Sequence, residues 1–164
     1  MTAEREVAIR PLTRPGDLGW VAMKHGELYA SELGFGTGFE AFVARVVADH
    51  HDEQGGGPQA AWIAEVDGVR AGSVFCVRAD ERTAKLRLLI VDPAARGLGL
   101  GSLLVREALR FATDAGYKVM TLWTIDKLGP ARHIYEKLGF ELAACAPHTD
   151  YGSGLVDETW TRRL

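Results

Sequence analysis

The sequence predicts a mixed α+β fold in which a central, mostly antiparallel twisted sheet carries helices on both faces. An apolar run at residues 86–91 leads through alternating glycines at 96–101 into an amphipathic helical pattern at 102–115. An Asp-Gly pair at 67–68 separates two β-rich runs, and a second strand–helix unit occupies 117–139. These observations together indicate a strand–loop–helix–strand unit built into a sheet of hairpins.

The first third of the chain predicts one strand and two helices. Residues 6–10 form a short β-rich run that Pro11 ends. Apolar residues at helical spacing predict helices over about 17–34 and about 38–51. The glycines and proline of residues 54–58 predict a flexible surface loop.

The middle of the chain predicts a hairpin and the strand that carries the glycine loop. Residues 61–66 and 69–77 are β-rich, and the Asp-Gly pair between them favours a type I′ turn, because both central residues of that turn need positive φ. Residues 79–83 are a polar turn into the strand at 86–91.

The last third predicts a helix between strands. The run at 117–124 is rich in β-formers, and residues 131–139 form a short helical pattern that ends at Gly139. Two further strands are expected near 141–146 and 155–162.

Composition indicates one soluble enzyme-sized domain over residues 1–164. The chain is 47% hydrophobic and 25% charged, with a net charge of −3 and a pI near 5.9, so it lacks the basic character of a nucleic-acid-binding domain. Cys76 and Cys145 both lie in apolar runs, and we expect buried, reduced thiols. No signal peptide or apolar span is evident, and no metal site is assigned, so we expect a cytoplasmic protein without a membrane partner.

The glycine loop predicts a phosphate site. Glycines after a strand and before a helix expose backbone N–H groups at the positive end of the helix dipole, and Arg96 adds a charge. A Walker A loop is excluded because no lysine follows Gly101. The dinucleotide fingerprint is excluded because Ser102 stands where its last glycine would be. A glycine-rich turn that binds no ligand is the alternative.

Two motifs together resemble the GNAT acyltransferases. The pattern Arg-x-x-Gly-x-Gly, residues 96–101, follows Val91-x-Pro93 as in the coenzyme A loop of that family. The pattern Ala-x-x-x-Tyr-x-x-x-Gly-Phe, residues 131–140, is similar to the family's second signature. The resemblance spans about residues 60–140 and implies that the strands at 86–91 and 119–124 splay apart around acetyl-CoA.

The resemblance also implies roles for residues. The backbone of Leu89, Ile90 and Val91 would pair with the pantetheine arm, and Tyr135 would protonate the departing thiolate, the alternative being a tyrosine that only packs under Phe140. The implied cofactor-binding residues are Leu89, Ile90, Val91, Arg96, Gly97, Leu98, Gly99, Leu100, Gly101, Ser102, Thr124, Asp126 and Tyr135. Leu128 stands where many members have a cofactor-binding asparagine, and Thr124 or Asp126 would replace that contact.

The acceptor site and the base stay less defined. Glu32 is the candidate catalytic base, and the residues expected to line the acceptor pocket are His25, Tyr29, Glu32, Glu40, His148 and Tyr151. Each could equally be a solvated surface residue, and His25 and Tyr29, four apart on one helix face, could form a structural pair.

A narrower resemblance concerns acetyltransferase domains fused to MarR-type regulators, carried by residues 17–20, 25–29 and 85–89. No winged helix precedes the first predicted strand, so DNA binding is not expected. The leading hypothesis is an N-acetyltransferase that moves the acetyl group of acetyl-CoA directly to an amine of a small molecule or protein in a ternary complex. The alternatives are a non-catalytic acyl-CoA sensor and an acyltransferase with a longer acyl group or an oxygen nucleophile. A homodimer is compatible with the resemblance.

Overall fold

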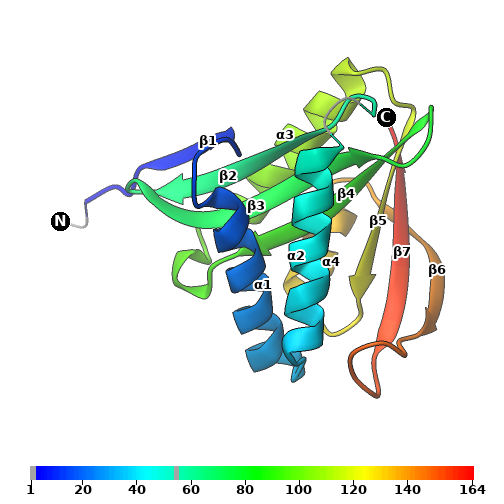
Figure 1. The fold of residues 1–164 in the computed structure, drawn as a ribbon. Helices are drawn as coiled ribbons and strands as arrows, with labels where there is room; N and C mark the ends of the chain where they lie inside the picture. Colours follow the sequence, from blue (N-terminus) through cyan, green and yellow to red (C-terminus); the bar gives the residue numbers. More distant parts are fainter. Residues whose placement is uncertain (1–2, 54–55) are drawn as a thin grey trace.

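A seven-stranded sheet with helices on both faces forms the protein (Figure 1). The computed structural model describes residues 3–53 and 56–164. The strands are β1 (Val7–Pro11), β2 (Ala60–Val66), β3 (Val69–Arg78), β4 (Thr83–Val91), β5 (Val119–Ile125), β6 (Glu141–Pro147) and β7 (Val156–Arg163). The helices are α1 (Asp17–Leu33), α2 (Thr37–Asp52), α3 (Leu100–Asp114) and α4 (Gly129–Lys137), with a 3₁₀ turn at Pro93–Ala95.

The strand order β1-β2-β3-β4-β5-β7-β6 confirms the predicted mixed sheet. Only β4 and β5 pair in parallel, and every other neighbouring pair is antiparallel. The β4–β5 connection runs through α3, as a parallel crossover requires. Helices α1 and α2 cover one face, and α3 and α4 cover the other (Figure 1).

Alternating side chains divide the core between the two faces of the sheet. Phe75 and Ile63 pack with α1 and α2, whereas Leu86 and Leu122 pack with α3. This alternation follows the two-residue period of a strand, and because both faces of the central strands are covered, those strands are apolar on both sides.

The predicted elements form close to the expected bounds. Asp67 and Gly68 have φ values of 51° and 78°, which confirms the type I′ turn. Helix α3 begins at Leu100 rather than at Ser102, and β4 begins at Thr83 rather than at Leu86. Residues 54–55 of the predicted loop lie outside the described residues.

One prediction about the cysteines is wrong. Cys76 is buried in β3 as expected, but Cys145 is exposed. Its apolar run forms β6, the edge strand of the sheet, and all of that strand is exposed because no helix covers it.

Strands β4 and β5 part at their carboxyl ends, as the family resemblance implies. Their pairing covers only residues 83–86 of β4 and 119–122 of β5. Just beyond, Leu88 has a φ of 53°, the β3–β4 register shifts between Ser73 and Phe75, and the Ser73 hydroxyl donates to the Leu88 carbonyl at 2.9 Å. This bulge turns β4 away from β5 and opens a gap in the sheet.

Within residues 3–53 and 56–164, no helix combines the length and the apolar character that crossing a bilayer needs.

Candidate active site

A cavity of about 260 Å³ lies where β4 and β5 part. Residues 85–89 of β4 and Trp123 and Thr124 of β5 form its walls, together with side chains of α1, α2, α4 and the β6–β7 connection. Leu128, Ala131 and Tyr135 line it from the side of α4. The cavity therefore reaches through the gap in the sheet from one helical layer to the other.

The glycine loop presents backbone donors that no protein group uses. Among the described residues, the amide N–H groups of residues 97–102 donate to no backbone or side-chain acceptor, and the first bond of α3 runs from the Leu103 amide to the Gly99 carbonyl at 3.1 Å. No side chain caps this helix. Unsatisfied amides at a helix N-terminus are an anion site, which fits the phosphates of acetyl-CoA.

The glycines of the loop have two different roles. Gly97 and Gly99 have φ values of 87° and 73°, and a Cβ on either would meet no atom within 4 Å, so their surface is open to a ligand. A Cβ on Gly101 would lie 2.5 Å from the Cδ1 atom of Ile134. Gly101 therefore lets α4 pack against α3, a role that the sequence motif does not reveal.

Arg96 and Glu32 form an ion pair with each other, between the loop and α1. Neither residue lines the cavity. A second pair, Lys24 with Asp92 at 3.1 Å, joins the same two segments. Glu32 therefore contacts the predicted phosphate loop rather than the acceptor pocket, and this position does not support its predicted role as base.

Tyr135 lies at the cavity wall with its ring fixed. The ring packs edge-on to Phe140, with centroids 5.8 Å apart, and also against Trp160. Tyr135 therefore has the packing role that the sequence analysis gave as the alternative to proton donation. The hydroxyl makes no hydrogen bond with any described residue. Burial, and less strongly Tyr29, raises the pKa of Tyr135, so the phenol stays protonated at neutral pH and can donate a proton into the cavity.

The backbone of β4 beyond Leu86 has an open edge. Ile90 and Val91 pair with Ser73 and Gly72 of β3, and no described strand pairs with these residues on the β5 side. A free strand edge can bond an extended amide chain, as the pantetheine arm is. The predicted contacts of Leu89, Ile90 and Val91 are thus compatible with the structure.

Thr124 and Asp126, the two predicted replacements for the missing cofactor-binding asparagine, differ in their access to the cavity. Thr124 is buried and lines the cavity beside Leu128. Asp126 does not line it, and its carboxylate accepts the Val156 amide at 2.9 Å instead. Asp126 thereby holds the start of β7 against the end of β5, so only Thr124 has access to a ligand in the cavity.

His25 and Tyr29 line the cavity from α1 and stack with ring centroids 5.9 Å apart. The Nδ1 atom of His25 lies 2.7 Å from the Val21 carbonyl, so Nδ1 carries the hydrogen and donates it. Nε2 is buried without a protein partner. Burial lowers the pKa of His25 to about 4 and raises the pKa of Tyr29 to about 12, so both are neutral near pH 7.

Asp150 and Tyr151 of the β6–β7 connection, together with Asp157 of β7, close the cavity. His148 stands behind them: its Nδ1 atom lies 2.7 Å from an Asp157 carboxylate oxygen, and its Nε2 accepts the Tyr151 amide at 3.0 Å. His148 therefore positions cavity residues and does not line the cavity. Glu40 does not line it either, because its carboxylate lies over Gly26 of α1.

Sequence reasoning missed several cavity residues. The missed side chains that can bind a polar group are Lys85, Arg87, Trp123, Asp150 and Asp157. The signal for the first two is in the sequence: Lys85 and Arg87 alternate with apolar residues in a strand that leads directly to the glycine loop. Charges at alternate positions of a central strand share one face, which indicates a polar site there.

Comparison with known proteins gives both sequence relatives and structural matches. An uncharacterized N-acetyltransferase of Schizosaccharomyces pombe is 42% identical over 57 residues, which make up 35% of this chain and 35% of that protein. Human N-acetyltransferase 8B is 36% identical over 85 residues, 49% of this chain and 37% of that protein. The matched parts cover little more than a third of the length of these relatives.

Solved structures match almost the whole chain. A Salmonella typhimurium protein described as an acetyltransferase with its cofactor acetyl-CoA has a TM-score of 0.77 at 20% identity, over 96% of this chain and 94% of that one. A GNAT-family protein of Desulfovibrio desulfuricans has a TM-score of 0.75 at 22% identity, over 96% and 99% of the two chains. At this identity the matches show a shared fold. The model of the acetyltransferase (GNAT) family matches residues 27–140, and the chain belongs to this family.

Proposed function

We propose that this protein is an N-acetyltransferase that moves the acetyl group of acetyl-CoA to a primary amine by direct transfer in a ternary complex. The observation that carries the proposal is the row of unused amides at residues 97–102, next to a cavity that opens between β4 and β5. The family match and the N-acetyltransferase names of the relatives support it.

Different segments of this chain bind different parts of acetyl-CoA. The amides of residues 97–102 hold the pyrophosphate, and the open edge of β4 at Leu89, Ile90 and Val91 bonds the pantetheine amides. Bound acetyl-CoA supplies an acetyl group activated as a thioester. Backbone N–H groups near Ile90 and Val91 polarise its carbonyl.

Tyr135 acts as the general acid. When the amine nitrogen bonds to the carbonyl carbon and the carbon–sulfur bond breaks, the Tyr135 hydroxyl donates its proton to the sulfur. Burial raises the pKa of Tyr135, so the hydroxyl keeps its proton at neutral pH and is available to hydrogen-bond the departing sulfur and protonate it. The amine proton leaves to a base whose identity stays a prediction, and Glu32, which pairs with Arg96, is the residue to substitute first.

The second candidate function is a sensor that binds acyl-CoA without turnover. A free Tyr135 hydroxyl at the cavity wall favours the enzyme, because binding alone does not need an acid beside the sulfur. Isothermal titration with coenzyme A and thiol release from acetyl-CoA over a panel of amines separate the two functions. We expect binding and release; binding without release for every amine would establish the sensor, and no binding would contradict both.

Four further properties of the protein stay predictions from the sequence. These are the narrower likeness to MarR-fused acetyltransferase domains, a homodimer, a cytoplasmic location, and the expectation that the protein binds neither nucleic acid nor a membrane.

A further inference from the structure

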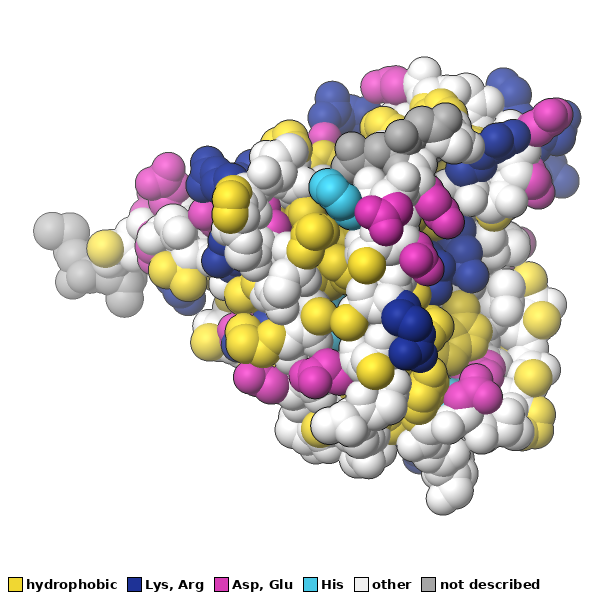
Figure 2. All heavy atoms as spheres, viewed as in Figure 1, with side chains coloured by type: hydrophobic (Ala, Val, Ile, Leu, Met, Phe, Trp, Pro, Cys, Tyr) yellow, Lys and Arg dark blue, Asp and Glu magenta, His cyan; other side chains and the backbone are white. Residues whose placement is uncertain are grey.

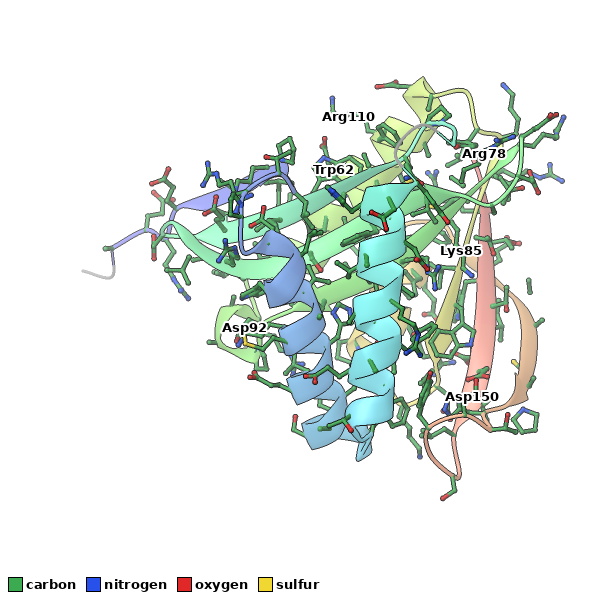
Figure 3. The ribbon with its side chains drawn as sticks, viewed as in Figure 1. Trp62, Arg78, Lys85, Asp92, Arg110 and Asp150 are labelled. Atoms are coloured by element: carbon green, nitrogen blue, oxygen red, sulfur yellow. The ribbon has the colours of Figure 1, made fainter. Side chains whose placement is uncertain are left out.

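Lys85 and Arg87 place two cations in the acceptor half of the cavity. Both lie on β4 and line the cavity, and between them Leu86 points to the opposite face, into the core under α3. Figure 3 shows Lys85 beside α2, in the space between that helix and β5. The register places Lys85 next to Thr121 of β5, so the neighbouring strand offers a hydroxyl but no carboxylate.

Neither cation has an anionic partner in the part of the chain that the structure describes. Within residues 3–53 and 56–164, neither side chain forms an ion pair or a hydrogen bond, although both are partly buried. Burial lowers the pKa of both, and the neighbouring charge of Arg87 lowers that of Lys85 further. The carboxylate of Asp49 on α2 raises the pKa of Arg87 by a Coulomb interaction, but the two side chains form no ion pair. Since a partly buried, unpaired charge costs free energy, two adjacent ones indicate a site for an anion that the protein does not supply.

The same cavity is also lined by carboxylates. Asp150 and Asp157 line it, and Asp157 is held from behind by His148 at 2.7 Å. Neither carboxylate pairs with Lys85 or Arg87. Figure 2 shows an apolar patch beside α2, with basic and acidic side chains next to each other above it and acidic side chains below it. Cationic and anionic side chains therefore both line this one cavity.

Apolar and aromatic side chains line much of the rest of the cavity. Phe39, Phe42 and Val43 of α2 face Trp123 of β5, which remains 39% exposed. Such a wall accepts a hydrocarbon or aromatic group and also attracts a cation through the ring faces. The volume of about 260 Å³ admits a small molecule, not a folded partner.

We propose that the acceptor is a small amine that also carries a carboxylate, an amino-acid-type zwitterion: Lys85 and Arg87 bind its carboxylate, Asp157 receives its ammonium group, and the aromatic wall holds its side chain. This inference rests on the proposed acetyl transfer and narrows its acceptor. A polyamine or a lysine side chain of a protein brings a cation and no carboxylate, so it leaves Lys85 and Arg87 unpaired.

The test compares acceptors that differ only in the carboxylate. Thiol release from acetyl-CoA is measured with phenylalanine, phenylalaninamide and phenethylamine, and with methionine against 3-(methylthio)propylamine. We expect kcat/KM to be about ten- to a hundredfold higher for each acid, the effect of hydrogen bonds to a charged group. Equal or higher values for the amines without a carboxylate would overturn the proposal.

Variants connect the preference to these two residues. Lys85→Gln and Arg87→Gln should reduce the preference for the acids by about tenfold or more, mainly through KM, and Lys85→Arg should keep most of it. Lys118→Gln and Arg82→Gln make the same charge changes at exposed positions outside the cavity and should leave the preference unchanged. An unchanged preference in the cavity variants would place the carboxylate elsewhere and contradict the inference.

A binding measurement separates this inference from the proposed function. Titration of phenylalanine and of phenethylamine into the complex with coenzyme A needs no turnover. If coenzyme A does not bind, the acetyltransferase proposal fails. If coenzyme A binds and the acid binds no better than the amine, the present inference fails alone.

Discussion

His148 fixes Asp157 at the wall of the cavity. Its Nε2 accepts the Tyr151 amide at 3.0 Å, so the hydrogen of the neutral ring is on Nδ1, which lies 2.7 Å from the Asp157 carboxylate. The ring also stacks on Phe35, with centroids 5.6 Å apart. One histidine thus sets both the β6–β7 connection and the orientation of a carboxylate that faces the acceptor space.

Loss of this pair should weaken acceptor binding and leave the cofactor site intact. We expect His148→Leu to raise KM for the amine about tenfold through the freed Asp157, with an unchanged Kd for coenzyme A. Initial rates at varied acceptor concentration and titration with coenzyme A measure both. His133→Leu, at an exposed position of α4, is the control, and a KM equal to that of the parent would refute the positioning role.

Removal of the Tyr135 hydroxyl should slow the chemical step. Tyr135→Phe keeps the packing on Phe140 and Trp160 but removes the proton donor, so kcat should fall at least about tenfold while KM for acetyl-CoA changes little. Tyr117→Phe loses a hydroxyl that donates to Pro58 at 2.6 Å, outside the cavity, and should keep the parental kcat. An undiminished kcat in Tyr135→Phe would exclude proton donation by this residue.

A negative charge on the glycine loop should prevent cofactor binding. Gly99→Glu places a carboxylate and a strained φ among the free amides, so the Kd for coenzyme A should rise at least about tenfold through repulsion of the phosphates. Gly116→Glu is a matched control, because its φ of 92° and open surroundings impose the same strain far from the loop. Equal affinities in the two variants would remove the loop from the site.

Substitution of Glu32 distinguishes a base from a surface partner. Because Glu32 pairs with Arg96 outside the cavity, we expect Glu32→Gln to keep kcat and its pH profile within about threefold, the range of a partly exposed ion pair. Freed Arg96 should bind coenzyme A at least as tightly as in the parent. A tenfold drop in kcat with loss of the limb at low pH would instead establish Glu32 as the base.

Stability should fall between pH 6.5 and 4 because of His25. Burial lowers the pKa of His25 in the folded state to about 4, below its ordinary value of 6.5, so in this range the unfolded chain binds a proton that the folded protein excludes. Stability therefore rises with pH there, by about 3 kcal/mol in total for this group. Urea unfolding at several pH values should show a shallower dependence in His25→Leu, with His50 supplying part of the remainder. An equally steep dependence in the variant would contradict this assignment.

The local patterns of the sequence were sufficient to predict the elements and the geometry of the glycine loop and of the Tyr135 helix. Glycines at 97, 99 and 139 adopt the positive φ values that their places after a strand or helix require. Tyr135 lies where its motif places it, because α4 and its end at Gly139 are encoded within one short segment. Short-range geometry of this kind can be derived from neighbouring residues alone.

The acceptor half depended on the tertiary structure. The family resemblance predicted Glu32 and Glu40 near the acceptor pocket. In the structure Glu32 pairs with Arg96, and the carboxylate of Glu40 lies over Gly26. Only the bulge at Leu88 and the parting of β4 from β5 bring Lys85, Arg87 and Asp157 to one cavity. By itself the sequence determined the fold class and predicted the phosphate loop and the acid; the folded chain decided which charges line the cavity, because they come from segments far apart whose approach no local pattern encodes.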